Sequence, residues 1–182
     1  MELKGERLIP APIDTTWAGL NDPEILKACI AGCESLERTA DDAFQALVAV
    51  RVGPVAAKFK GNLKLTDVKP PSSYTIHFDG QGGAAGFGKG SADVQLVPQA
   101  GGTRLSYSAR AQVGGKMAQV GSRLIDAAAG KIAEDFFAAF EAKLAPAAAA
   151  EAVPAPAAGG GRLVWWIVGA VLTLAALWYF TR

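Results

Sequence analysis

The sequence predicts an α+β domain of the helix-grip type, a curved antiparallel sheet wrapped around a long C-terminal helix, followed by a C-terminal transmembrane helix. Three observations predict this. Short segments with alternating apolar and polar residues follow one another closely, as in an antiparallel sheet. From Met117 to Leu144 the apolar residues then recur at helical spacing. Finally, Leu163 to Phe180 is an uncharged apolar run that would cover about 27 Å as a helix, close to the thickness of a bilayer.

The first elements are one strand and two short helices. Glu2–Ile9 is predicted as a strand, and Pro12–Leu20 as a helix with candidate N-terminal caps in Asp14–Thr16. A second helix begins at Asn21–Pro23, where either of the first two residues can cap it and proline fits the first turn. Gly32 is the expected end of this helix.

The middle of the chain is predicted as a series of antiparallel strands. Alternation is clearest in the third of them, where Phe59, Leu63 and Leu65 share one face and lysines occupy the other, as in a strand with one wet side. The predicted strands are Ser35–Arg38, Phe44–Val52, Val55–Asp67, Tyr74–Asp79, Ser91–Val97 and Thr103–Val113.

The long helix predicted from Met117 to Leu144 has an unusually thin apolar stripe. Alanines are frequent in it, and glycines stand at 121 and 130. Such a helix either leaves a cavity beneath it or packs closely on the sheet, and both interpretations remain open here. The stripe consists of Val120, Leu124, Ala128, Ile132, Phe136 and Phe140, with Ile125 and Phe137 beside it.

A cavity under this helix would be lined by apolar side chains from the strands and the helix. Most of these residues are equally suited to an ordinary core. The candidate lining residues are Phe59, Leu63, Leu65, Tyr74, Ile76, Phe78, Phe87, Tyr107, Met117, Val120, Leu124, Ala128, Ile132 and Phe136.

The C-terminal part of the chain is predicted to tie the domain to a membrane. Residues 1–144 form the domain, residues 145–161 an Ala/Pro/Gly-rich flexible linker, and residues 162–182 the transmembrane anchor. Aromatic side chains suited to the two membrane interfaces stand near the ends of the apolar run, at Trp165, Trp166, Trp178 and Tyr179. Because the charged N-terminus does not resemble a signal peptide, we expect a single-pass tail anchor in the cell membrane with the domain in the cytoplasm.

Few residues suggest catalysis. His77 stands opposite Tyr74 and Phe78 in the alternation, so we expect it on the surface and find no Ser-His-Asp set. No cluster with metal-ligand spacing occurs. Cys29 and Cys33 are expected to be small reduced thiols, since they do not form a C-x-x-C motif. A net charge of +1 gives no indication of nucleic-acid binding, and we predict a protein that is not an enzyme.

The glycine-rich segment Gly80–Gly90 is a candidate functional loop. A phosphate-binding loop would connect a strand to a helix, whereas this segment connects two strands, so nucleotide binding is not expected. It is predicted either as a hairpin whose apolar tip, Phe87, gates the cavity or docks a partner, or as a plain flexible hairpin.

Six segments of the chain, in order, resemble the CoxG family of accessory proteins of aerobic carbon monoxide dehydrogenases. The resemblance extends from Met1 to about Leu144, although Ala31 stands where family members commonly have proline. The segments are WAGLNDPEIL at Trp17–Leu26, IAGCESL at Ile30–Leu36, VGPVAAKFKG at Val52–Gly61, GFGKG at Gly86–Gly90, TRLSY at Thr103–Tyr107 and GGKMAQVGSRLI at Gly114–Ile125.

The resemblance implies a START-like (SRPBCC) helix-grip domain without catalysis of its own. It further implies recruitment of a molybdenum-containing CO dehydrogenase, or a related molybdenum hydroxylase, to the cytoplasmic membrane. A respiratory quinone, menaquinone or ubiquinone, would bind non-covalently in the cavity. The sequence leaves one alternative open, a pure recruitment adaptor with an incidental cavity.

Overall fold

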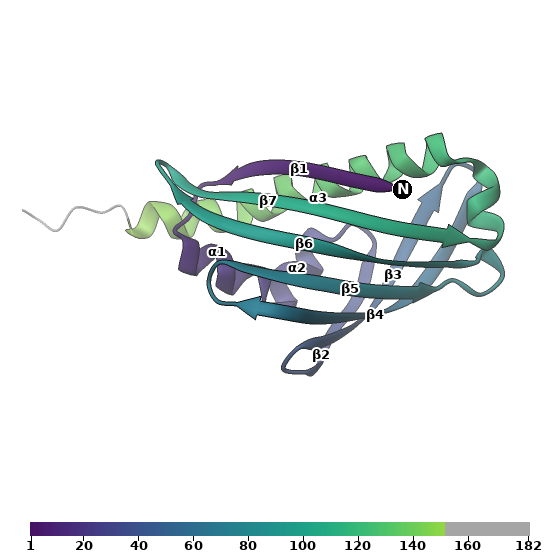
Figure 1. Ribbon diagram of the computed structural model, residues 1–182, viewed down its shortest axis with the longest axis horizontal. Helices are drawn as coiled ribbons and strands as arrows, with labels where there is room; N and C mark the ends of the chain where they lie inside the picture. The colour runs from purple at the N-terminus through teal and green to yellow at the C-terminus, as the bar shows by residue number, and fades with distance from the viewer. Residues whose placement is uncertain (152–182) are drawn as a thin grey trace, which may run out of the picture. The chain divides into compact units, whose positions relative to one another are not determined.

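The computed structural model describes residues 1–151, which form an α+β domain with one seven-stranded antiparallel sheet (Figure 1). The architecture confirms the predicted class and is consistent with a helix grip. The elements are β1 (Glu2–Ile9), α1 (Ile13–Leu20), α2 (Pro23–Cys29), β2 (Cys33–Ala40), β3 (Ala43–Val52), β4 (Val55–Lys69), β5 (Ser73–Gln81), the 3₁₀ helix η1 (Gly83–Ala85), β6 (Phe87–Gln99), β7 (Gly102–Gly114), the 3₁₀ helix η2 (Gly115–Val120) and α3 (Ser122–Glu151).

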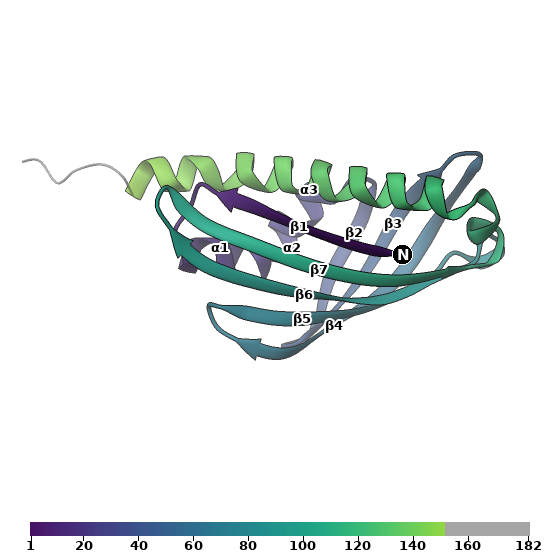
Figure 2. The ribbon, with the colours of Figure 1, turned by 45° about the horizontal axis from the view of Figure 1, so that its top comes forward.

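In the sheet, strands β2 to β7 follow one another in sequence order, and only β1 is out of this order. The strand order is β1-β7-β6-β5-β4-β3-β2, so β1 leaves the sequential series and pairs with the last strand. Helices α1 and α2 connect β1 at one edge of the sheet to β2 at the other. Figure 2 shows α3 running lengthwise across the curved sheet. The space between α3 and the sheet is therefore bounded by strands, by the long helix and, at one end, by the two short helices.

The start of α2 agrees with the prediction, whereas the start of α1 and the end of α2 do not. Asp22 caps α2, since its Oδ1 accepts a hydrogen bond of 2.9 Å from the Glu24 backbone N–H. Helix α1 instead follows Pro12 and has no side-chain cap, so the caps predicted within Asp14–Thr16 are wrong. Helix α2 ends at Cys29, before Gly32, which has a φ of +76° in the following turn.

A glycine divides the predicted C-terminal helix. Gly121 has a φ of +93°, a conformation that an α-helix does not contain, so residues 115–120 form η2 and α3 starts only at Ser122. The stripe itself drifts around α3, because residues four apart advance by about 40° in an α-helix, so Leu124 and Phe140 lie on nearly opposite sides. Leu124, predicted to face the interior, is 48% exposed, whereas Ile132 is 43% exposed but still borders the space beneath α3.

The buried core is concentrated where α3 meets the short helices. Phe140 is fully buried, and a Cβ atom on Gly19 of α1 would lie 3.2 Å from its ring, so the two helices pack closely there. Two buried threonines close this end of the domain: the Thr16 and Thr103 hydroxyls both donate to the Ala11 carbonyl, at 3.4 and 2.8 Å. At this end of the domain α3 is therefore packed closely against α1.

The predicted linker and anchor fall largely beyond the part of the chain that the structure describes. Helix α3 continues to Glu151, into the segment predicted as a linker. The anchor at 162–182, with Trp165, Trp166, Trp178 and Tyr179, lies outside the described residues. Within residues 1–151, no helix combines the length and the apolar composition that crossing a membrane requires.

Candidate functional site

An apolar cavity of about 430 Å³ lies between the concave face of the sheet and α3. This volume falls in the range of small-molecule sites in proteins, about 300–1,000 Å³. Every lining side chain is aliphatic or aromatic: Leu3, Leu20, Leu26, Ile30, Leu36, Phe44, Leu63, Leu65, Tyr74, Ile76, Ala92, Val94, Leu105, Tyr107, Ala109, Ala129, Ile132, Ala133, Phe136 and Phe137.

Small residues on α3 create the space. Ala129 and Ala133 lie one turn apart and both line the cavity, whereas Phe136 and Phe137 close it toward the core. The two phenylalanine rings pack edge to face, with centroids 5.2 Å apart, and Phe136 also stacks on Phe140. The alanine-rich stretch of α3 therefore covers the sheet without filling the gap beneath it.

Half of the candidate lining residues from the sequence line this cavity. They are Leu63, Leu65, Tyr74, Ile76, Tyr107, Ile132 and Phe136. The other half, which is not brought to the cavity, consists of Phe59, Phe78, Phe87, Met117, Val120, Leu124 and Ala128.

Three of the aromatic rings placed elsewhere lie over glycines instead. A Cβ atom on Gly82 would lie 2.6 Å from the Phe59 ring, and one on Gly90 would lie 2.8 Å from the Phe78 ring. Phe87 starts β6 on the outer face of the sheet, opposite Gly114 in the register, and is 39% exposed. The rings of Phe59 and Phe78 thus cover bare backbone on the inner face, and Phe87 is not at the mouth of the cavity.

The remaining four belong to the segment around the break at Gly121. Met117 is buried within η2 but does not join the main core cluster. Leu124 lies near the β3–β4 turn, where a Cβ atom on Gly53 would be 3.6 Å from it. Val120 and Ala128 are half-buried and line no part of the cavity.

The lining residues from α1, α2 and several strands were not predicted from the sequence. Leu20, Leu26 and Ile30 come from the two short helices and the residue after them, whose role as one wall depends on the tertiary fold. Four more stand at inward positions of their strands and are buried: Leu36, Phe44, Val94 and Leu105. Alternation alone could have identified these four, because each is the apolar member of an alternating pair.

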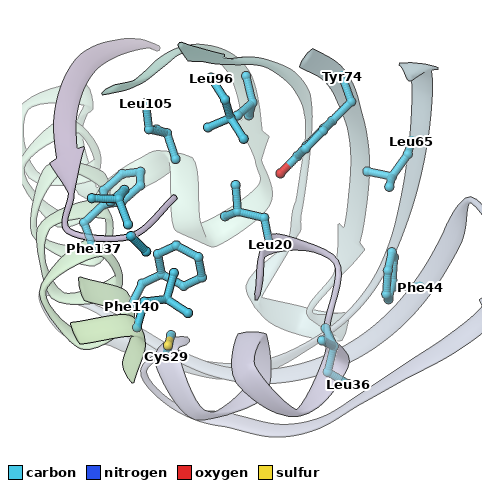
Figure 3. Close-up of a cluster of buried hydrophobic side chains, with 14 of the residues drawn as sticks. Leu20, Cys29, Leu36, Phe44, Leu65, Tyr74, Leu96, Leu105, Phe137 and Phe140 are labelled. Carbon is cyan, nitrogen blue, oxygen red and sulfur yellow. The ribbon is translucent and has the colours of Figure 1, made fainter. Parts of the chain in front are cut away.

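Among the described residues, two tyrosines supply the only polar side-chain atoms in the lining. Tyr74 on β5 is 4% exposed, and its ring packs edge to face against Trp17, with centroids 5.3 Å apart. Burial raises the pKa of the Tyr74 hydroxyl well above its usual value, so this group stays protonated. Tyr107 on β7 stacks on Phe137 at 5.2 Å. In Figure 3 the hydroxyl oxygen of Tyr74 points inward, toward Leu20.

The outer face of the sheet carries the polar candidates. His77 is exposed there, as predicted, and its Nε2 lies 3.1 Å from the Thr66 hydroxyl. A hollow of about 590 Å³ on this face includes His77, Lys89 and Arg110, and none of these side chains is buried. Such an open, solvated surface lacks the enclosure that a small-molecule site needs.

Nothing in the described range suggests a metal centre or a reactive thiol. Across residues 1–151, no three His, Cys, Asp or Glu side chains are placed to hold a metal ion together. Cys29 and Cys33 are both free, and burial raises the pKa of each thiol, which disfavours the reactive thiolate. The chemistry of the site is therefore that of an apolar binding cavity with two hydroxyl groups.

A comparison with protein families identifies the chain. The family model for CoxG, described as a subunit of carbon monoxide dehydrogenase, matches residues 5–145, from within β1 through the rest of the sheet to the last core residue of α3, Leu144. The chain belongs to the CoxG family. No match was found among curated proteins.

Solved structures share the fold of this CoxG-family chain. A conserved protein from Geobacillus kaustophilus is 32% identical, with a TM-score of 0.75 over 80% of this chain and 96% of that one. A protein from Thermus thermophilus is 19% identical, with a TM-score of 0.62 over 81% and 99% of the two chains. A protein from Mycobacterium smegmatis is 17% identical, with a TM-score of 0.61 over 80% and 92%. The last two similarities concern the fold alone.

Proposed function

We propose that this CoxG-family chain is a membrane-tethered, non-catalytic accessory protein. It binds a hydrophobic ligand, a respiratory quinone such as menaquinone or ubiquinone. It thereby links a cytoplasmic molybdenum-containing dehydrogenase of the CO dehydrogenase type to the respiratory chain in the membrane. The observation that carries this proposal is the apolar cavity of about 430 Å³ beneath α3.

The physical basis for binding is the removal of apolar surface from water. Each 100 Å² of ligand surface buried in the cavity contributes about 2.5 kcal/mol. Part of this gain offsets the loss of translational and rotational freedom. A site with twenty apolar or aromatic lining residues favours a ligand that is apolar over most of its surface. A quinone with an isoprenoid chain meets that requirement, whereas a nucleotide or a sugar does not.

The family and the C-terminal sequence support the remaining parts of the proposal. The family name associates the chain with carbon monoxide dehydrogenase as a subunit, and an accessory role fits a protein without catalysis of its own. An anchor at residues 162–182 would hold the domain close to the bilayer, where a long-chain quinone resides. Tethering raises the effective concentration of the domain at the membrane without any additional contact.

Extraction of bound lipid tests the proposal directly. We expect the full chain, purified from its membrane in polymer nanodiscs, to carry quinone in excess of the amount in protein-free nanodiscs from the same membrane, as measured by mass spectrometry. Ala133→Phe fills the cavity and is expected to remove this excess. Ala138→Phe, on the exposed side of α3, is the matched control and should retain it. Equal amounts of quinone in the wild-type, Ala133→Phe and Ala138→Phe samples would contradict the proposal.

A further inference from the structure

Tyr74 presents a polar group to a cavity that is otherwise apolar. Tyr74 is 4% exposed, and its ring packs edge to face against Trp17 on the inner side of the sheet. No hydrogen bond of its hydroxyl to another group occurs within residues 1–151. Buried tyrosine hydroxyls usually have a partner, and the lack of one costs free energy.

The Tyr74 hydroxyl is nevertheless reachable from the cavity. No fully enclosed side-chain nitrogen or oxygen in the described part of the chain lacks a hydrogen-bond partner. An unpartnered Tyr74 hydroxyl must therefore face open space, and Figure 3 shows its oxygen directed into the interior toward Leu20. The group is thus a donor aimed at whatever occupies the cavity.

The position of Tyr74 defines the deep wall of the cavity, and Ile132 defines the mouth. Both residues line the same space, but Ile132 is 43% exposed whereas Tyr74 is 4% exposed. An isoprenoid chain of many units is too long for a volume of about 430 Å³, so part of it must leave past the exposed residue. A ligand with one polar end and one long apolar chain fits this cavity in one orientation, with the polar end at Tyr74 and the chain leaving past Ile132.

We propose that the Tyr74 hydroxyl donates a hydrogen bond to a carbonyl oxygen of the bound quinone, which enters ring first while its apolar chain leaves past Ile132. This inference rests on the proposed function and adds the orientation of the ligand and the residue that selects its ring. Tyr107 carries the other hydroxyl in the lining. Tyr107 is partly exposed and shares its row of the sheet with Tyr74, with Val94 between them in the register.

The experiment compares two probes of similar shape on the full chain. One is a benzoquinone with a decyl chain, and the other is decylbenzene, which lacks carbonyl groups. We expect Tyr74→Phe to weaken quinone binding about three- to tenfold, the effect of one lost hydrogen bond, and to leave decylbenzene binding unchanged. Tyr107→Phe removes the other hydroxyl of the lining and should weaken quinone binding less than Tyr74→Phe does.

Infrared spectroscopy supplies a readout that altered packing alone would not produce. With a ¹³C-carbonyl quinone, the wild-type chain should show a carbonyl stretch lowered by hydrogen bonding, and Tyr74→Phe should restore the higher frequency. An unshifted wild-type carbonyl counts against the inference even if the Tyr74→Phe variant fails to fold. An unshifted carbonyl in the wild type, unchanged affinity in Tyr74→Phe, or equal weakening of both probes would overturn the inference. A wild-type chain that binds decylbenzene but not quinone would overturn it too, and one that binds neither probe would overturn the proposed function itself.

Discussion

The ring of Tyr107 lies against the backbone of Gly5. A Cβ atom on Gly5 would be 2.6 Å from the Tyr107 hydroxyl oxygen, and the two residues stand opposite each other in the β1–β7 register. On its other side the ring stacks on Phe137 of α3, with an angle of 27° between the planes. Tyr107 is therefore held between an edge strand and the helix, and this packing fixes one wall of the cavity.

Gly5→Ala is expected to displace the Tyr107 ring. In a strand, alanine in place of glycine ordinarily stabilises by about 0.5–1 kcal/mol. Here the methyl group would overlap the ring, and overpacking of this kind costs about 1–3 kcal/mol, so the overlap should dominate. We predict a net decrease in the free energy of unfolding, measured by urea titration, together with weaker quinone binding.

Lys4→Ala is the matched control for that change. Lys4 is the neighbouring residue on the outer face of β1, where its side chain makes a solvent-exposed ion pair with Glu2. Such pairs contribute about 0–1 kcal/mol, so stability and binding should change little. If Gly5→Ala proves more stable than wild type, the ring does not occupy the position described.

Local patterns in the sequence predicted most of the fold. Alternation along β4 correctly indicated an inner face with Leu63 and Leu65, and the Asp22-Pro23 pair correctly marked the start of α2. Both signals depend only on neighbours within a few residues. The start of α3 was wrong because a positive φ at Gly121 interrupts the helix, and helical spacing alone does not reveal such a break. Leu124 was placed on the wrong side because a stripe counted in steps of four drifts by about 40° per step.

The candidate site was harder to predict because it depends on cross-strand register. The inner position of Phe59 follows from alternation, but nothing local indicates that Gly82 lies beneath its ring. The wall formed by Leu26 and Ile30 likewise exists only once α2 packs under α3. The alanine content of α3 was the informative signal for the cavity, since small side chains leave the space that Ala129 and Ala133 border.

Stability at alkaline pH should depend on Tyr74. Burial raises the pKa of its hydroxyl above the usual value of 10.0 in the folded chain, whereas the unfolded chain ionises near 10. The stabilisation is therefore complete below about pH 10 and is lost as the pH rises above it. Between pH 10 and 11, wild type should lose up to about 1 kcal/mol more than Tyr74→Phe, as one extra proton dissociates on unfolding.

Urea titrations at pH 8, 10 and 11 measure this difference. Burial also raises the pKa values of the Cys29 and Cys33 thiols, but both proteins share these groups, so their contribution cancels in the comparison. Parallel loss of stability in wild type and Tyr74→Phe would show that the hydroxyl is not buried as described.

Anchoring and ligand binding should be separable in cells. Deletion of residues 162–182 is expected to release the partner dehydrogenase into the soluble fraction. Ala133→Phe should leave the dehydrogenase at the membrane but lower quinone-dependent substrate oxidation at least several-fold, because its side chain occupies the cavity. Fractionation and respiration measurements check the two effects. Full respiration in Ala133→Phe would favour a pure adaptor with an incidental cavity.

Two glycines of β6 should respond oppositely to the same substitution. A Cβ atom on Gly90 would overlap the Arg110 carbonyl oxygen and lie 2.8 Å from the Phe78 ring, whereas one on Gly88 would meet nothing within 4 Å. Gly90→Ala should therefore destabilise by about 1–3 kcal/mol. Gly88→Ala, two residues away in the same strand, should be neutral or stabilise by up to about 1 kcal/mol through the unfolded chain. Thermal unfolding of the two variants distinguishes them, and equal shifts in Tm would mean that Phe78 does not cover the backbone at Gly90.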